Sequence, residues 1–299
     1  MVGVGDYVLE MNSNSRLMSV LIGLACSCWA ADPVYPVHSL GNSQIRDLPK
    51  SANGREYRLL VGLPYSYGTQ PTKRYPVLYI LDGFWDFTLV NGMYGNLLYD
   101  KAVPEFIIVG HSYPGENPKF DSLRNFDYQP VADPSRDPKA LTTGHGADFL
   151  DVLRKQIIPF VQKEYRVDTT FRVLGGSSLG GIFALYAAYE APGLFQGVIA
   201  ASPAIKPFEP WFLPYEAAYS RKSKSLPVRM FLSTAGEEWP DFSQGIRQFH
   251  DTLESRHYKG LALKWRIVDG ERHAGTKAES YSRGLRWVFE GLAPDPNGK

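Results

Sequence analysis

One serine in the middle of the chain has neighbours that suit nucleophilic chemistry. Ser178 lies at the centre of the sequence Gly-Ser-Ser-Leu-Gly at residues 176–180, a G-x-S-x-G pattern. Residues 171–174 form a short apolar run typical of a buried strand, and residues 182–189 form an apolar run long enough for a helix. At such a strand-to-helix turn the serine takes a strained backbone conformation, so its hydroxyl is exposed beside the N-terminus of the next helix. We therefore interpret Ser178 as a candidate nucleophile.

A serine in a glycine-rich turn also has a structural interpretation, as the N-cap of the following helix. The apolar runs on both sides, and the further glycines at 175 and 181, favour the catalytic interpretation. Spacing excludes two phosphate-binding motifs. Serines at 177 and 178 take the place of the second glycine of G-x-G-x-x-G, and no Gly-Lys-Ser or Gly-Lys-Thr follows.

A serine hydroxyl needs a general base, which in this arrangement follows the serine and an acid along the chain. Three histidines follow Ser178. His250 and His257 fall within and at the end of a predicted helix over residues 241–257, where a surface or capping histidine is the simpler interpretation. His273 lies in a glycine-containing loop after a predicted strand over residues 262–268. We therefore expect His273 to be the general base.

The acid is less well defined by the sequence. The loop after the predicted strand over residues 228–234 contains Glu237, Glu238 and Asp241. We expect Asp241 to be the N-cap of the next helix. The sequence does not decide between the two glutamates, and we favour Glu238, with Glu237 second.

Two backbone amides are candidates for an oxyanion hole. The predicted central strand over residues 75–81 ends at Asp82-Gly83-Phe84-Trp85, and the carboxyl ends of parallel strands share one edge of a sheet. The N–H groups of Phe84 and Leu179 are therefore expected to face one crevice. The Asp82-Gly83 pair is also a simple tight turn, and both interpretations can hold.

Candidates for substrate binding are Trp85, Arg124 and Tyr128. The last two lie in a polar segment over residues 111–146 that we expect to be a long irregular loop, and such loops are often functional. Arg124 and Asp127 are equally expected to form a local surface ion pair.

The rest of the chain alternates strand and helix patterns, which predicts a mainly parallel α/β sheet in one large domain. Other predicted elements are an edge strand at 55–63, a buried strand at 106–110, an amphipathic helix at 147–165 that bends or ends near Pro159, a strand at 197–201, a partly helical flap at 210–222 and a closing helix at 280–289.

Composition limits the partners. The 299 residues carry a net charge of +1, from 32 basic and 31 acidic residues without long runs, so there is no electrostatic footprint for nucleic acid. We expect a small-molecule substrate that is neutral or of modest size. The sequence does not define the oligomeric state.

The first residues resemble a secretory leader. An apolar stretch at 17–25 follows Arg16 and precedes small residues, and it is shorter than the roughly 20 apolar residues of a membrane span. We predict a signal segment over residues 1–31 with a true start possible at Met11, a catalytic domain over 32–292 and a polar tail over 293–299. Lipidation of Cys26 is the rival interpretation, although Gly23 suits it poorly.

Cleavage would remove both cysteines of the chain, Cys26 and Cys28. A disulfide or a cysteine-based metal site is then excluded from the mature protein. We expect no cofactor and no metal.

Several of these segments resemble α/β hydrolases of the putative-esterase group, which includes S-formylglutathione hydrolases, feruloyl and acetyl xylan esterases, mycolyltransferases and siderophore esterases. The resemblance spans about residues 57–292, and it is nearest to single-domain periplasmic esterases of the enterobactin and salmochelin type. It is carried by YPVLYILDG at 75–83, RNFDYQP at 124–130, GADFLDVLRKQIIPFVQKEYRVD at 146–168, the segment around GGSSLGG at 175–181, and His273 with the later GLRWVF.

The resemblance implies an α/β-hydrolase fold, with a mostly parallel central sheet and helices on both faces, and ester hydrolysis. It places the catalytic serine and histidine on Ser178 and His273, and the oxyanion amides on Phe84 and Leu179. The chain departs from many relatives by having Ser177, rather than histidine, before the nucleophile, and by its poorly defined acid.

The leading hypothesis is a secreted or periplasmic serine esterase that acts on siderophore trilactones. The alternatives within the fold are a feruloyl or acetyl carbohydrate esterase and an acyltransferase. An inactive hydrolase-fold binding protein is the alternative from another class, and the presence of both Ser178 and His273 argues against it.

Overall fold

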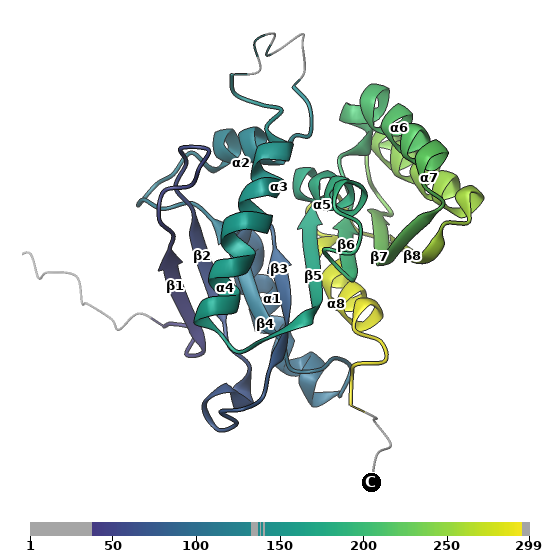
Figure 1. The fold of residues 1–299 in the computed structure, drawn as a ribbon. Helices are drawn as coiled ribbons and strands as arrows, with labels where there is room; N and C mark the ends of the chain where they lie inside the picture. Colours follow the sequence, from purple (N-terminus) through teal and green to yellow (C-terminus); the bar gives the residue numbers. More distant parts are fainter. Residues whose placement is uncertain (1–37, 133–136, 138, 140, 295–299) are drawn as a thin grey trace, which may run out of the picture. The chain divides into compact units, whose positions relative to one another are not determined.

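An eight-stranded sheet is the frame of the molecule, with strand order β1-β2-β4-β3-β5-β6-β7-β8 (Figure 1). The computed structural model describes residues 38–132, 137, 139 and 141–294, so the predicted signal segment lies outside the described residues. The strands are β1 (Ser43–Asp47), β2 (Arg58–Gly62), β3 (Tyr75–Ile80), β4 (Ile107–Ser112), β5 (Val167–Ser177), β6 (Gly197–Ala201), β7 (Ser225–Ala235) and β8 (Lys259–Val268).

The neighbouring strands β4, β3, β5, β6, β7 and β8 are parallel. The antiparallel pairs are β1 with β2 and β2 with β4. The predicted mostly parallel sheet is therefore confirmed. The prediction that the strand near residues 55–63 lies at the edge is wrong, because β1 pairs with β2 on its outer side. β1 was missed because its one large apolar side chain, Ile45, is exposed and leaves no apolar alternation to detect.

Helices cover both faces of the sheet (Figure 1). Alternate residues of the central strand β3 show why: Val77 and Tyr79 join one apolar cluster, and Leu78 and Ile80 join the other. The second cluster also takes the apolar residues of α1 (Gly83–Tyr99) and α8 (Lys277–Val288). The first takes those of α3 (Gly146–Val152), α4 (Ile158–Glu164), α5 (Leu179–Glu190), α6 (Ile205–Lys222) and α7 (Pro240–Arg256).

The amphipathic helix predicted over residues 147–165 is present as one helical stretch with an irregular centre. Between α3 and α4 lies a π-helical turn, Leu153–Ile157, and Pro159 stands in the first turn of α4. Proline lacks the N–H that a continuous α-helix would need, so the wider turn before it relieves the mismatch.

Two predictions for polar segments are wrong. Residues 111–146 are not one irregular loop, because β4 extends to Ser112 by pairing with β2, and α2 (Phe120–Tyr128) follows. Residues 210–222 are not a partly helical flap but the larger part of α6, which starts at Ile205. The remaining helical element is a short 3-10 turn, Tyr65–Gly68.

Candidate active site

Ser178 occupies the strained turn that the sequence predicted. It joins the end of β5 to the start of α5 with φ 55° and ψ −115°, and its N–H donates to the carbonyl of Ala201 in β6 at 2.9 Å. Glycine is needed two residues earlier, since a Cβ on Gly176 would lie 2.4 Å from the carbonyl oxygen of Gly180. Ser178 stands at the N-cap of α5, yet its side chain makes no capping hydrogen bond. The purely structural interpretation requires such a bond. Because it is absent, the Ser178 hydroxyl is not used to cap the helix.

His273 is bonded to one of the two candidate glutamates. Its Nδ1 lies 2.9 Å from Oε2 of Glu238, whose side chain is 0% exposed. The His273 ring is also flanked by the rings of Trp239 and Phe242, at centroid distances of 5.3 and 4.9 Å. With Nδ1 engaged by the carboxylate, Nε2 is the ring nitrogen left to exchange a proton with another group.

Backbone hydrogen bonds between two loops bring this pair together. After β7, the N–H of Gly236 donates to Val268 at 2.7 Å, and that of Glu237 donates to Glu271 at 2.8 Å. The loops after β7 and β8 therefore continue side by side beyond the sheet. Glu238 and His273, 35 residues apart in sequence, face each other across them.

The other two acidic candidates lie away from the imidazole. Glu237 is 58% exposed and pairs with exposed Arg272 at 3.5 Å. Asp241 lies in the first turn of α7 and is not its N-cap as we predicted; the N-cap is Trp239, because Pro240 takes the first helical position with its preset φ.

The three catalytic candidates share one edge of the sheet. Ser178 follows β5, Glu238 follows β7 and His273 follows β8, and β5 to β8 are parallel neighbours. The carboxyl ends of parallel strands lie at the same edge, where ligands bind in open α/β sheets.

The two predicted oxyanion amides lie in the first turns of adjoining helices. Phe84 is the second residue of α1 and Leu179 the first of α5, so neither N–H has a carbonyl one turn earlier in its own helix to bind. The helix starts are close, since a Cβ on Gly180 would lie 3.1 Å from a carboxylate oxygen of Asp82. Positive helix ends and free amides together favour an anion at this place.

Arg124 lies beside this turn and lines a pocket. Its Nε and one terminal nitrogen each donate to an oxygen of Asp82 at 2.7 Å. The predicted surface pair with Asp127 is wrong, because Asp127 is buried and pairs with Arg55 at 3.2 Å. The pocket, of about 640 Å³, is also lined by Leu179, Ala204, Pro207, Phe208 and Trp211.

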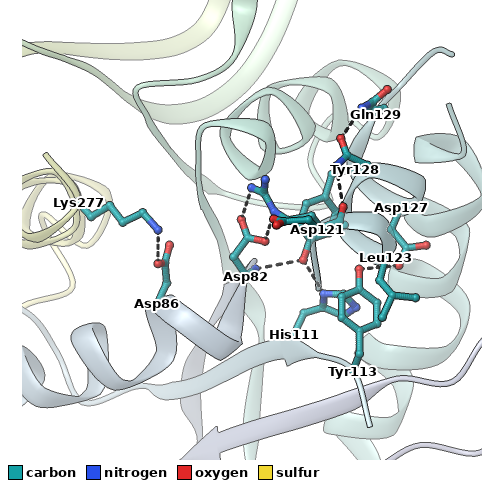
Figure 2. Close-up of polar contacts among 12 residues, drawn as sticks. Asp82, Asp86, His111, Tyr113, Asp121, Leu123, Asp127, Tyr128, Gln129 and Lys277 are labelled. Carbon is teal, nitrogen blue, oxygen red and sulfur yellow. Dashed lines mark hydrogen bonds and ion pairs between the residues drawn. The ribbon is translucent and has the colours of Figure 1, made fainter. Parts of the chain in front are cut away.

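The other two predicted substrate-binding residues differ from each other. Trp85 is 43% exposed, and the guanidinium carbon of Arg124 lies 5.8 Å from its ring centroid, so it stands at the surface near the site. Tyr128 is 0% exposed, and its hydroxyl is bound to the N–H of Asp82 and to His111 (Figure 2). The expectation that Tyr128 contacts substrate is therefore not met, because the side chain is enclosed beneath the turn.

Sequence reasoning missed a buried clamp between α1 and α8. Asp86, in the first turn of α1, accepts a bond from Nζ of Lys277 at 2.7 Å (Figure 2). It also accepts one from the hydroxyl of Tyr281 at 2.5 Å. Burial raises the pKa of Asp86. The clamp ties the helix that carries Phe84 to the helix that follows His273. No local pattern could reveal it, since the partners are 191 and 195 residues apart.

The pocket beside Leu179 is smaller than a hollow elsewhere on the molecule. A hollow of about 740 Å³ is lined by Tyr65, Lys73, Tyr99 and Glu105, among others, near the first residues of β3 and β5. This is the opposite end of the strands from Ser178. Two of its ionic groups are engaged with each other, since Lys73 binds Glu105 at 2.6 Å.

The described residues contain neither a cluster of metal-binding side chains nor a membrane-spanning helix. No group of three or more His, Cys, Asp or Glu side chains is placed to hold a metal ion in this part of the chain. Within the same ranges, no helix has the length and apolar character needed to cross a bilayer.

The mostly parallel sheet with helices on both faces and a strained serine turn after β5 is the α/β-hydrolase fold, as predicted. The chain belongs to the family described as putative esterase, whose model matches residues 50–275. Its fold is similar to that of the BES protein from Bacillus cereus, with a TM-score of 0.75, 25% identity, and coverage of 86% of this chain and 98% of that one.

Two relatives are named as esterases. Ferri-bacillibactin esterase BesA of Bacillus subtilis is 26% identical, with 86% of this chain and 92% of that protein covered. Siderophore triacetylfusarinine C esterase of Aspergillus fumigatus is 32% identical, with 79% and 90% covered. The resemblance to siderophore esterases is thereby confirmed, and the chain is placed among hydrolases that act on esters.

Proposed function

We propose that the chain is a serine esterase with Ser178 as nucleophile, His273 as general base and Glu238 as the acid of the triad. The observation that carries the proposal is the 2.9 Å contact between Nδ1 of His273 and buried Glu238, at the same sheet edge as the strained serine. A carboxylate on Nδ1 holds the imidazole in the tautomer that accepts a proton at Nε2.

The reaction follows from these positions. Oγ of Ser178 attacks the ester carbonyl carbon while His273 takes the hydroxyl proton. The negative oxygen of the tetrahedral intermediate accepts hydrogen bonds from the N–H groups of Phe84 and Leu179. The intermediate collapses as His273 returns the proton to the leaving alcohol, and an acyl-enzyme remains. Water, activated by the same histidine, then releases the carboxylic acid and restores the serine.

The favoured substrates are siderophore esters, including trilactones. Support comes from the relatives, which are named as esterases of ferri-bacillibactin and triacetylfusarinine C. The pocket beside Leu179 adds to this, because the cationic side chain of Arg124 and the ring of Trp211 line it. A pocket that combines Arg124, amide side chains and a hydroxyl with apolar groups suits a bulky acyl group that carries polar substituents.

We also propose that the protein acts outside the cytoplasm, in the periplasm or secreted. The support is the leader pattern over residues 1–31, with its apolar stretch after Arg16. Fractionation of the host followed by intact-mass analysis tests this: an extracytoplasmic protein with a mature N-terminus near Ala31 agrees with the proposal, and a purely cytoplasmic chain contradicts it.

The nucleophile is tested with Ser178→Ala and the matched control Ser177→Ala, which removes the neighbouring buried hydroxyl. With p-nitrophenyl acetate, Ser178→Ala should lower kcat by about 10⁴-fold or more, and Ser177→Ala should remain near wild type. A fluorophosphonate probe should label the wild type and Ser177→Ala only. Unchanged turnover in Ser178→Ala, or a wild type that the probe does not label, would refute a serine mechanism. A wild type that is neither labelled nor active would favour a binding protein.

The substrate class is tested on the same wild-type protein. Ferri-bacillibactin and a ferric catecholate trilactone should give linear products, detected by mass, at higher kcat/KM than methyl ferulate or acetylated xylan. The opposite order would assign the enzyme to carbohydrate-linked esters, and transfer of the acyl group to an added alcohol in preference to water would make it an acyltransferase.

A further inference from the structure

The residue before helix α1 has an unusual backbone conformation. Asp82 has φ 53° and ψ 39°, in the left-handed region that is disfavoured for residues with a Cβ. This geometry sets the direction in which the chain leaves β3, and therefore where the N–H of Phe84, two residues later, points. A conformation of this kind persists only where the surroundings hold it.

Two residues of α2 hold Asp82 from different sides. The Arg124 guanidinium binds both carboxylate oxygens at 2.7 Å, and the Tyr128 hydroxyl accepts the backbone N–H at 3.1 Å (Figure 2). The Arg124 contact acts on the side chain. The Tyr128 contact acts on the peptide itself, so it restrains the backbone at the turn directly.

The Tyr128 hydroxyl has a second partner, the ring of His111. The hydroxyl lies 2.6 Å from Nδ1 of His111, a residue of β4. Burial lowers the pKa of His111 to about 3, so the ring is neutral at neutral pH. The hydroxyl oxygen accepts from the N–H of Asp82, and its own proton can be donated to Nδ1 when the ring proton of His111 is on Nε2.

We propose that Tyr128 and His111 are positioning residues for the oxyanion hole. His111 orients the Tyr128 hydroxyl, the hydroxyl holds the N–H of Asp82, and the left-handed turn at Asp82 aims the amide of Phe84. The proposal depends on the proposed function, in which that amide binds the oxyanion. It assigns a purpose to a histidine that the catalytic steps do not use and to a tyrosine that cannot reach a substrate.

Tyr57 provides a matched control. Its side chain is also 0% exposed, and its hydroxyl also has two partners, Asn53 at 2.8 Å and Asp127 at 3.2 Å. Neither partner is bonded to Asp82. Tyr57→Phe and Tyr128→Phe therefore each remove two hydrogen bonds of a buried tyrosine hydroxyl, and only the second removes one from the turn.

The experiment compares these variants by steady-state kinetics and thermal unfolding. Tyr128→Phe should lower kcat with p-nitrophenyl acetate about 10- to 100-fold, less than the loss of a whole oxyanion donor, with KM changed less than about twofold. Its affinity for a phenylboronic acid, whose serine adduct puts a negative oxygen in the same hole, should fall by a similar factor. Tyr57→Phe should lower stability to a similar extent but leave kcat and boronate affinity near wild type.

A second pair tests the histidine. His111→Asn places an amide oxygen near the position of Nδ1 and should keep most of kcat, whereas His111→Leu removes the acceptor and should lose as much as Tyr128→Phe. The proposal is overturned if Tyr128→Phe and Tyr57→Phe have the same kcat, if the loss is in KM alone, or if Asn and Leu at position 111 behave alike. Failure of the serine mechanism itself is distinguishable, because it would show in the Ser178→Ala assay.

Discussion

The choice between two adjacent glutamates gives the sharpest prediction. Glu238→Gln keeps the size of a side chain that is 0% exposed and bonded to His273, but removes its charge. Glu237→Gln makes the same chemical change one residue away, on a side chain that is 58% exposed and whose partner, Arg272, is also exposed. The pair therefore separates the catalytic role of a carboxylate from the general effect of removing one negative charge from this loop.

The expected loss follows from the geometry. The His273 imidazole becomes positive when it takes the serine proton, and the Glu238 carboxylate then lies at a charge separation of about 4 Å. With an effective dielectric constant of about 20, this attraction is worth about 4 kcal/mol, or about 10³-fold in rate. A dielectric constant below that of water is appropriate because the rings of Trp239 and Phe242 flank the imidazole. For Glu237, solvent screening should limit the change in rate to less than about twofold.

The assay is kcat and kcat/KM for p-nitrophenyl acetate, with thermal unfolding as the check that each variant is folded. Glu238→Gln should lower kcat by about 10²- to 10⁴-fold, whereas Glu237→Gln should match the wild type. Two results would refute the reasoning: a folded Glu238→Gln with wild-type kcat, or a loss in Glu237→Gln as large as that in Glu238→Gln.

Two further predictions concern folding. Gly176→Ala would place a Cβ 2.4 Å from the carbonyl oxygen of Gly180, so it should destabilise the protein by about 3 kcal/mol and abolish turnover. The control Gly92→Ala, in open space on α1, should be neutral or stabilising, and equal melting temperatures of the two variants would contradict the prediction. Burial raises the pKa of Asp127 to about 6, despite the pairing with Arg55, so the folded chain holds more protons than the unfolded one between about pH 4 and 6. Stability should therefore fall as pH rises through this window, by up to about 3 kcal/mol, and urea unfolding of Asp127→Asn should lack that slope; parallel pH profiles would show the assignment to be wrong.

The fold class and the strained turn that carries the proposed nucleophile could be predicted because their signals are local. The strand, the glycines and the helix around Ser178 occupy one short segment, and the clash at Gly176 is with an atom only four residues away. The alternation of apolar runs likewise reports parallel strands and covering helices without any knowledge of distant contacts. His273 was found by the same logic, from a loop that follows a strand.

Burial in the polar segments could not be predicted in this way. Tyr128 and Arg124 lie four residues apart on α2, yet one is enclosed beneath the turn and the other lines the pocket. The helix has only nine residues, fewer than the roughly 11 to 18 over which helical periodicity is read. Its structure depends on partners such as Asp82, which lies between β3 and α1, and His111, which lies in β4.

Sequence alone thus predicted the sheet and the loops that carry the proposed serine and histidine, since each prediction depends on residues close together in the chain. The sequence did not decide between Glu237 and Glu238 as the acid. Successive side chains leave a loop in different directions, and only the neighbouring loop determines which one is covered. The pairing of residues 236 and 237 with 268 and 271 made that selection, turning Glu238 inward to His273 and leaving Glu237 in water. Contacts between distant segments decide such questions because burial is a property of the assembled chain and not of any one stretch of it.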